Sequence, residues 1–122
     1  MPEKQRKTIY IADDDKAVRD SLCAFLETCG YDVRAYADGD DFLRHADARR
    51  ADCLLLDLDL PGASGRQVLE QLRASGVTTP AIVLTTNGKR VGSRLQKANV
   101  LAVLSKPVAG EELLRWLEKA CR

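Results

Sequence analysis

The chain has 122 residues, of which 45% are hydrophobic and 30% charged, and its formal net charge is +1. This length fits one domain with a buried core, which we place at residues 8–122 behind a charged leader at residues 1–7. The nearly neutral charge does not favour direct binding of nucleic acid. The sequence contains no signal peptide and no apolar run of the roughly 20 residues that cross a bilayer, so we expect a cytoplasmic protein without membrane contact.

The four cysteines form no CxxC pair, and the chain has a single histidine, so we predict no zinc-type site. Most of them fall within apolar periodic segments. We expect them to be reduced thiols that act as small buried hydrophobic residues. They are Cys23, Cys29, Cys53 and Cys121.

The first strand is predicted at Thr8–Ala12 and runs into three consecutive carboxylates, Asp13, Asp14 and Asp15. A helix follows, with Asp15 as a suitable N-cap and Gly30 at the position after its end. Apolar residues recur along it at helical spacing and form one stripe. They are Val18, Leu22, Phe25, Leu26 and Cys29.

The next segments predict an edge strand, a short helix and a central strand. Tyr31–Ala35 alternates between apolar and polar residues, which is typical of a half-exposed strand. A short helix is expected at Asp40–Asp47. Cys53–Leu56 is a continuous apolar run that ends at Asp57, which indicates a strand buried on both faces of a parallel sheet.

Ser64 and Gln67 have the spacing of a capping box, so a third helix should begin there and end at Gly76. Ala81–Leu84 is a second fully buried strand, which stops at Thr85. A fourth helix with one basic face is expected at Lys89–Ala98.

Leu101–Leu104 is the last predicted strand, and it is followed by Ser105, Lys106 and Pro107. The final helix carries an apolar stripe at helical spacing, formed by Leu113, Leu114, Leu117 and Ala120. Five strands thus alternate with five helices. This alternation predicts a three-layer α/β domain with a parallel sheet and right-handed crossovers.

The predicted strand ends bring chemistry to one edge of the sheet. Asp13 and Asp14 follow the first strand, Asp57 ends the third, and Thr85 and Lys106 follow the fourth and fifth. Because the carboxyl ends of parallel strands share one edge, we expect these side chains to meet there. Clustered carboxylates repel one another, and a bound divalent cation relieves this; oxygen-only ligation favours Mg²⁺.

A magnesium ion, an ammonium and a hydroxyl beside a carboxylate are the parts that phosphoryl transfer needs. A carboxylate nucleophile produces an acyl phosphate. Asp57 is the candidate, because it ends the central strand.

These motifs together resemble the receiver domain of two-component response regulators. They are Asp13-Asp14 after the first strand, Asp57-x-x-x-Pro61-x-x-x-Gly65, Thr85, and Lys106-Pro107, and the likeness covers about Thr8–Cys121. The first motif and the spacing from Asp57 to Thr85 are most similar to the nitrogen-fixation-regulator branch. The resemblance implies a flavodoxin-like (βα)5 fold with strand order 2-1-3-4-5.

The resemblance also implies roles for individual residues. Asp57 would accept a phosphoryl group from a histidine kinase, so that the domain catalyses only its own phosphorylation and dephosphorylation and is otherwise no enzyme. Asp14, Asp57 and the backbone carbonyl of Asp59 would ligate Mg²⁺, and Asp13 would act through a metal-bound water. Lys106 would pair with a phosphoryl oxygen, before a cis peptide to Pro107. Thr85 would move toward the phosphate, while the small Thr86 leaves the pocket open.

Two departures from the family pattern affect signalling more than chemistry. Val103 stands where the family often has an aromatic residue, three positions before Lys106. The run from Thr85 to Lys106 is also about one residue short for this branch. A partner protein, a second copy or an output domain is expected to use the fourth and last helices. We expect that the domain either works alone or belongs to a longer regulator.

Three other functions are alternatives to that of a phosphoacceptor. A dehalogenase-type phosphatase also uses Asp-x-Asp, but Pro61, the late position of the motif and the short chain disagree with it. A nucleotide or flavin domain needs a phosphate-binding loop after the first strand, where this chain has three carboxylates. A pseudo-receiver that folds and binds partners but is never phosphorylated stays open, because the acceptor residues are present while the switch aromatic is not.

Overall fold

The computed structural model describes residues 6–86 and 99–121. None of the helices in these ranges has the length and apolar character needed to cross a bilayer. The predicted fourth helix at Lys89–Ala98, with its basic face of Lys89, Arg90, Arg94 and Lys97, lies outside the described residues. The described elements are β1 (Thr8–Ala12), α1 (Lys16–Thr28), β2 (Asp32–Tyr36), α2 (Gly39–His45), a 3-10 turn (Ala48–Arg50), β3 (Cys53–Asp57), α3 (Gly65–Ala74), β4 (Ala81–Thr85), β5 (Val100–Ser105) and α5 (Gly110–Ala120).

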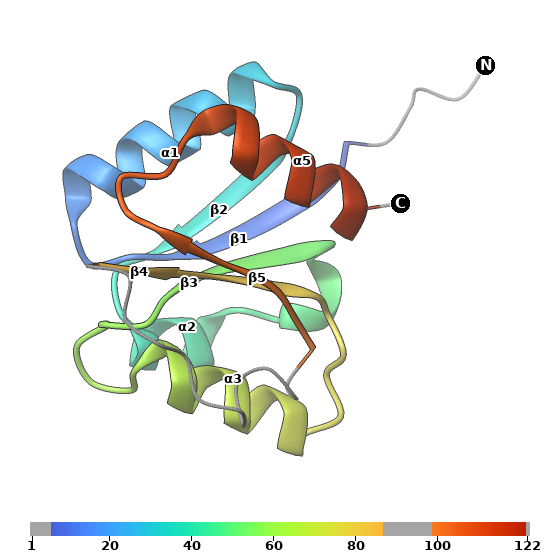
Figure 1. Cartoon of the computed structure of the whole chain (residues 1–122). Helices are drawn as coiled ribbons and strands as arrows, with labels where there is room; N and C mark the ends of the chain where they lie inside the picture. The colour runs from blue at the N-terminus through green and yellow to red at the C-terminus, as the bar shows by residue number, and fades with distance from the viewer. Residues whose placement is uncertain (1–5, 87–98, 122) are drawn as a thin grey trace.

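The strands form one sheet in the order β2-β1-β3-β4-β5, and every neighbouring pair is parallel. Helices α1 and α5 lie on one face of this sheet and α2 and α3 on the other (Figure 1). The predicted three-layer α/β architecture and flavodoxin-like strand order are therefore confirmed.

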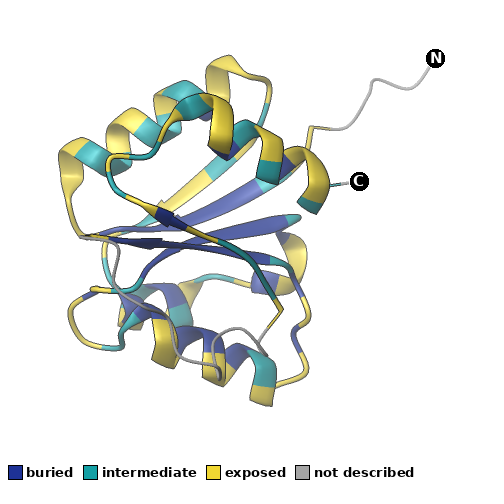
Figure 2. Cartoon of the chain, viewed as in Figure 1, coloured by how far each residue is buried: buried dark blue, intermediate teal, exposed yellow. Residues whose placement is uncertain are grey.

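Side chains of the central strands alternate between two apolar layers, as the period of a strand requires. Ile9, Ile11 and Leu55 pack on the side of α1 and α5, whereas Leu54 and Leu56 pack on the side of α2 and α3. All five are fully buried. Figure 2 shows the consequence, because the central strands are buried along nearly their whole length while the outer helix faces are exposed.

The helix signals in the sequence work as predicted. The Asp15 side chain accepts hydrogen bonds from the backbone N–H groups of Ala17 and Val18 at the start of α1. Ser64 and Gln67 form a reciprocal capping box at the start of α3. These caps bond backbone groups that the first turn of a helix leaves without partners.

The helix predicted at Asp40–Asp47 differs from the structure. Helix α2 begins at Gly39 because the Asp38 side chain accepts from the Asp41 N–H, and it ends at His45. Asp47 then caps the separate 3-10 turn by accepting from the Arg49 N–H. Asp47, which the prediction placed at the end of this helix, thus begins a separate element.

The prediction of buried cysteines is confirmed in full only for Cys53. Cys53 is buried in β3, and Cys23 and Cys121 are half-buried, but Cys29 is exposed. Cys29 is the residue that ends α1, so it lies beyond the apolar stripe that faces the sheet. All four thiols are free.

Gly65 allows the start of α3 to approach the end of β3. A Cβ atom at this position would collide with the backbone carbonyl of Asp57 and lie 3.0 Å from the Cα of Leu58. We expect Gly65→Ala to lower the free energy of unfolding by about 2 kcal/mol, because backbone atoms cannot move aside cheaply.

The matched control is Gly110→Ala. Its Cβ would lie 2.7 Å from the tip of the Phe25 ring, which can rotate away, so a loss below about 1 kcal/mol is expected. Urea denaturation of the three proteins measures both losses. Equal losses would contradict the assignment of Gly65 to a backbone contact.

Candidate functional site

Four strands deliver polar side chains to the same edge of the sheet. Asp13 follows β1, Asp57 ends β3, Thr85 ends β4 and Lys106 follows β5. Asp13, Asp57 and Thr85 are buried, with exposed fractions of 0%, 2% and 1%. The strand ends therefore meet as the sequence predicts, in a place that excludes most water.

Lys106 holds the centre of this edge. Its Nζ atom lies 2.8 Å from Asp57 Oδ2, to which it donates a hydrogen bond, and 2.8 Å from Asp13 Oδ2. Burial alone would lower the pKa of the ammonium, but the two carboxylates outweigh burial and raise it. Lys106 is therefore a fixed positive charge at neutral pH.

The carboxylate oxygens of this cluster differ in the hydrogen bonds that they accept. Asp13 Oδ1 accepts from the Asp15 N–H at 3.0 Å, and Asp57 Oδ1 accepts from the Asp59 N–H at 2.9 Å. Asp13 Oδ2 is fully buried and forms an ion pair with Lys106, but it accepts no properly directed hydrogen bond from the described residues. The Lys106 ammonium balances the charge of this oxygen at 2.8 Å but gives it no aligned hydrogen bond, so the oxygen can still accept one from a further polar partner.

The acidic cluster fits a divalent cation. Oxygen atoms of Asp13, Asp14 and Asp57 all lie within 4.8 Å of one another, and Asp14 is exposed while the other two are buried. The donors are all carboxylate oxygens, and one side of the cluster is open to water. Hard cations such as Mg²⁺ prefer these ligands and keep several waters. The residues therefore fit the predicted metal.

Thr85 and Asp59 stand on the rim of the cluster. The Thr85 hydroxyl donates to the carbonyl of Thr86 at 3.2 Å, so it is turned along its own strand. The Asp59 side chain is exposed and accepts from the Thr86 hydroxyl at 3.1 Å. Thr86 is therefore bound to the β3–α3 connection.

Sequence reasoning missed the contact of Arg19. This residue lies in the second turn of α1, and its guanidinium Nη1 donates to the backbone carbonyl of Asp13 at 2.8 Å. The only signal in the sequence is an arginine placed six residues after Asp13. Every residue has a backbone carbonyl, so the residue type at position 13 does not indicate that its carbonyl accepts this hydrogen bond. The partner of Arg19 could therefore not be predicted.

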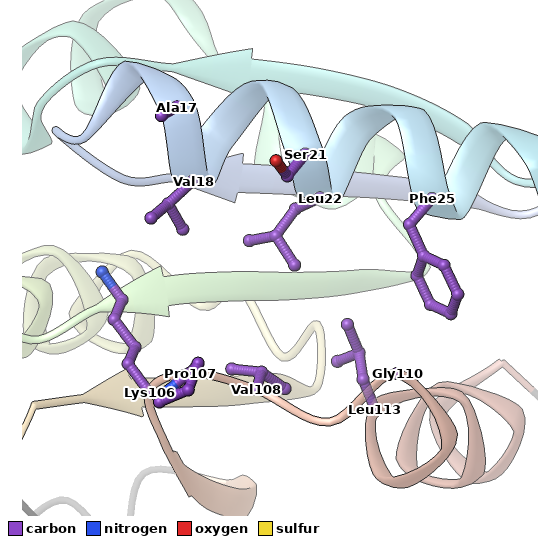
Figure 3. Close-up of a pocket in the computed structure, with 10 residues that line it drawn as sticks. All are labelled: Ala17, Val18, Ser21, Leu22, Phe25, Lys106, Pro107, Val108, Gly110 and Leu113. Atoms are coloured by element: carbon purple, nitrogen blue, oxygen red, sulfur yellow. The ribbon is translucent and has the colours of Figure 1, made fainter.

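An apolar cavity of about 620 Å³ opens beside the cluster, between α1 and the start of α5 (Figure 3). The aliphatic stem of Lys106 is part of its wall, and the side chain extends from the β5–α5 connection toward the side of α1. The peptide bond between Lys106 and Pro107 is cis, as the resemblance implies. Other wall residues are Val18, Leu22, Phe25, Val108 and Leu113.

The fold and the site together define a flavodoxin-like domain. It carries an acidic cluster and a lysine at the carboxyl edge of its sheet. Residues 9–118 match the family model described as the response regulator receiver domain. The chain belongs to this family, and the resemblance predicted from the sequence is confirmed.

Curated relatives are response regulators. The tetrathionate response regulatory protein TtrR of Salmonella typhimurium is 36% identical over 93% of this chain and 55% of its own length. The transcriptional regulatory protein FixJ of Bradyrhizobium diazoefficiens is 30% identical over 93% of this chain and 56% of its own length. The response regulator MprA of Mycobacterium ulcerans is 40% identical over 93% of this chain and 50% of its own length. The chain thus spans about half the length of the curated relatives that it matches.

Solved structures agree with this assignment. The response regulator StyR matches with a TM-score of 0.90 at 31% identity and covers 96% of this chain and 60% of that one. FixJ-N matches with a TM-score of 0.85 at 30% identity, over 97% of this chain and 95% of that one. Residues 9–118 therefore correspond to the receiver domain of such proteins.

The ion pairs of Lys106 predict a stability effect. We expect Lys106→Met to lower the free energy of unfolding by about 3 kcal/mol in EDTA at pH 7.5, because two buried carboxylates lose their shared counter-charge. The control is the exposed Lys16, whose ion-pair partner among the described residues is the exposed Asp20, and Lys16→Met should change stability by less than about 1 kcal/mol.

Urea denaturation measures both variants, and adding Asp13→Asn to Lys106→Met should recover part of the loss. Similar losses in the Lys106 and Lys16 variants would show that the pairs do not stabilise the fold.

Proposed function

We propose that this domain, as residues 8–122, accepts a phosphoryl group on Asp57 from the phosphohistidine of a histidine kinase. The observation that carries the proposal is the Lys106 ammonium at 2.8 Å from both Asp13 and Asp57, inside a cluster of three carboxylates. Response regulators partner with histidine kinases and output domains, and phosphorylation of an aspartate is typical of the family. A cytoplasmic location belongs to the same proposal.

Four residues would hold Mg²⁺. Asp14 and Asp57 would supply carboxylate oxygens, Asp59 its backbone carbonyl, and Asp13 would act through a metal-bound water. Asp13 Oδ2 supports this last role, because its ion pair with Lys106 is not aligned as a hydrogen bond and a water held there would donate an aligned one. When bound, the ion neutralises negative charge on the phosphoryl oxygens.

The residues of the chain divide the remaining work. An oxygen of Asp57 forms a bond to phosphorus while the bond from phosphorus to the kinase imidazole breaks, which gives an acyl phosphate. Lys106, now paired with the Asp57 carboxylate, would turn to a phosphoryl oxygen as charge moves onto that group. The Asp59 N–H, which donates to Asp57 Oδ1, keeps the carboxylate oriented.

Thr85 would report the phosphate. Its hydroxyl now donates to the Thr86 carbonyl, a weak local contact that a phosphoryl oxygen would replace. Val103, three residues before Lys106 on β5, carries no ring that could follow this movement, and it is 37% exposed. The response would reach a partner, a second copy or an output domain through the fourth helix and α5.

The decisive experiment is mass spectrometry after incubation with acetyl phosphate, with and without Mg²⁺. We expect a Mg²⁺-dependent gain of about 80 Da, the mass of one phosphoryl group, in the wild type and none in Asp57→Asn. Asp41→Asn serves as the control, because Asp41 is a carboxylate on α2 that pairs only with the exposed His45 among the described residues.

The Asp41 variant should keep the full gain. An unmodified wild type would favour the pseudo-receiver, which folds and binds partners without phosphorylation. A gain that persists in Asp57→Asn would move the acceptor to another residue.

Thr85→Ala separates phosphorylation from its response. We expect this variant to take up the phosphoryl group, since its hydroxyl forms no bond to Asp57 in this structure. Amide hydrogen exchange of β4 and β5 should differ between phosphorylated and unphosphorylated wild type, and this difference should disappear in the variant. An unchanged difference would remove Thr85 from the switch.

A further inference from the structure

Three of the four polar groups of Asp13 are fixed by the fold. Its N–H donates to the Tyr36 carbonyl at 3.1 Å, its Oδ1 accepts from the Asp15 N–H, and its carbonyl accepts from Arg19. The fourth, Oδ2, faces the Lys106 ammonium at 2.8 Å but accepts no aligned hydrogen bond from the described residues. Asp13 is thus oriented by its backbone, and one oxygen is left for the cluster.

The Arg19 contact is placed where it controls two carboxylates. The carbonyl of Asp13 belongs to the peptide unit that joins Asp13 to Asp14, and this unit is planar. Fixing the carbonyl direction therefore fixes the backbone angles on both sides of it. These angles decide where the side chains of Asp13 and Asp14 point.

Arg19 is well suited to fix this direction. It is half-buried, and its Nη1 donates over 2.8 Å in a charge-assisted hydrogen bond, the stronger kind. It also sits on α1, a helix of 13 residues packed on the sheet, so its own position is firm. The planar guanidinium holds an acceptor in a defined direction better than a lysine ammonium does.

The geometry points to Arg19 as a positioning residue for the cation site: by holding the Asp13 carbonyl, it orients the Asp13–Asp14 turn for Mg²⁺. This inference rests on the proposed function, because it concerns the metal of the same site. Arg19 contacts neither the metal nor the phosphoryl group. It acts only through the peptide unit of Asp13.

The sign of the effect distinguishes positioning from simple electrostatics. Arg19 is a cation close to a site that should bind another cation, so its charge alone weakens metal binding. Removing it should then tighten binding. Loss of orientation has the opposite result, since removing a group that orients a ligand typically weakens metal affinity by 10-fold or more.

The test measures Mn²⁺ binding from the EPR signal of the free ion, with Mg²⁺ as competitor. We expect Arg19→Met, which keeps the apolar stem, to bind both ions about 10-fold more weakly than wild type. Arg19→Lys, which keeps a charge and a donor, should recover part of the loss. Lys16→Met removes a cation from the first turn of the same helix without any contact to Asp13, and it should bind Mn²⁺ as tightly as wild type or more tightly.

Equal or tighter binding in Arg19→Met would overturn the inference while leaving the proposed function intact. If the wild type itself binds no Mn²⁺ or Mg²⁺, the metal site of the proposed function fails, and the inference fails with it. Thermal unfolding in EDTA shows whether each variant folds. Should Arg19→Met not fold, Arg19→Lys decides alone: weaker binding than wild type supports the inference, and equal or tighter binding overturns it.

Discussion

The structure of the site depends on one ammonium shared by two buried carboxylates. Each of the 2.8 Å contacts of Lys106 corresponds to about 6 kcal/mol of Coulomb attraction at an effective dielectric constant of about 20. Desolvation of three charges opposes this attraction by several kcal/mol per ion. The cluster is therefore held together without being strongly stabilising, and Asp13 Oδ2 keeps an ion pair that is not aligned as a hydrogen bond. Such a balance suits a site that must exchange partners rather than a permanent structural pair.

The parallel sheet makes this arrangement possible by continuing its backbone hydrogen bonds past the last paired residues. The N–H groups of Asp13, Leu58 and Lys106 donate to the carbonyls of Tyr36, Leu84 and Thr85 on the neighbouring strands. Each functional residue is thus held in or beside a bonded backbone even though it lies at the end of its strand. The side chains converge because the strands do, and Gly65 lets α3 begin directly against this edge.

Local and periodic features of the sequence were enough to predict the strands, a parallel sheet and the members of the cluster, whereas the strand order followed from the family resemblance. Apolar runs such as Cys53–Leu56 indicate burial on both faces, and a charged residue directly after such a run must lie at the edge of the sheet. Contacts that join a side chain to a distant backbone group were not predictable. The same holds for the direction of the Thr85 hydroxyl and the exposure of Cys29. Like the Arg19 contact, they depend on the backbone path of the connections, which no single residue type determines.

Because Val103 has no aromatic ring, a structural change at Asp57 must reach other elements by a route other than the movement of a ring on β5. A small β-branched side chain that is already 37% exposed has no buried and exposed alternatives to switch between. Among the described residues, hydrogen bonds connect this site to its surroundings: Asp59 N–H to Asp57, the Thr86 hydroxyl to Asp59, and the Lys106 N–H to the Thr85 carbonyl. They tie the β3–α3 connection, the end of β4 and the β5–α5 connection into one chain around the acidic cluster. If the acyl phosphate draws Thr85 and Lys106 toward itself, Thr86 moves with its neighbour and the bond to Asp59 must stretch or break. The rim of the site, rather than the outer surface of β5, is then the first part of the described structure to change.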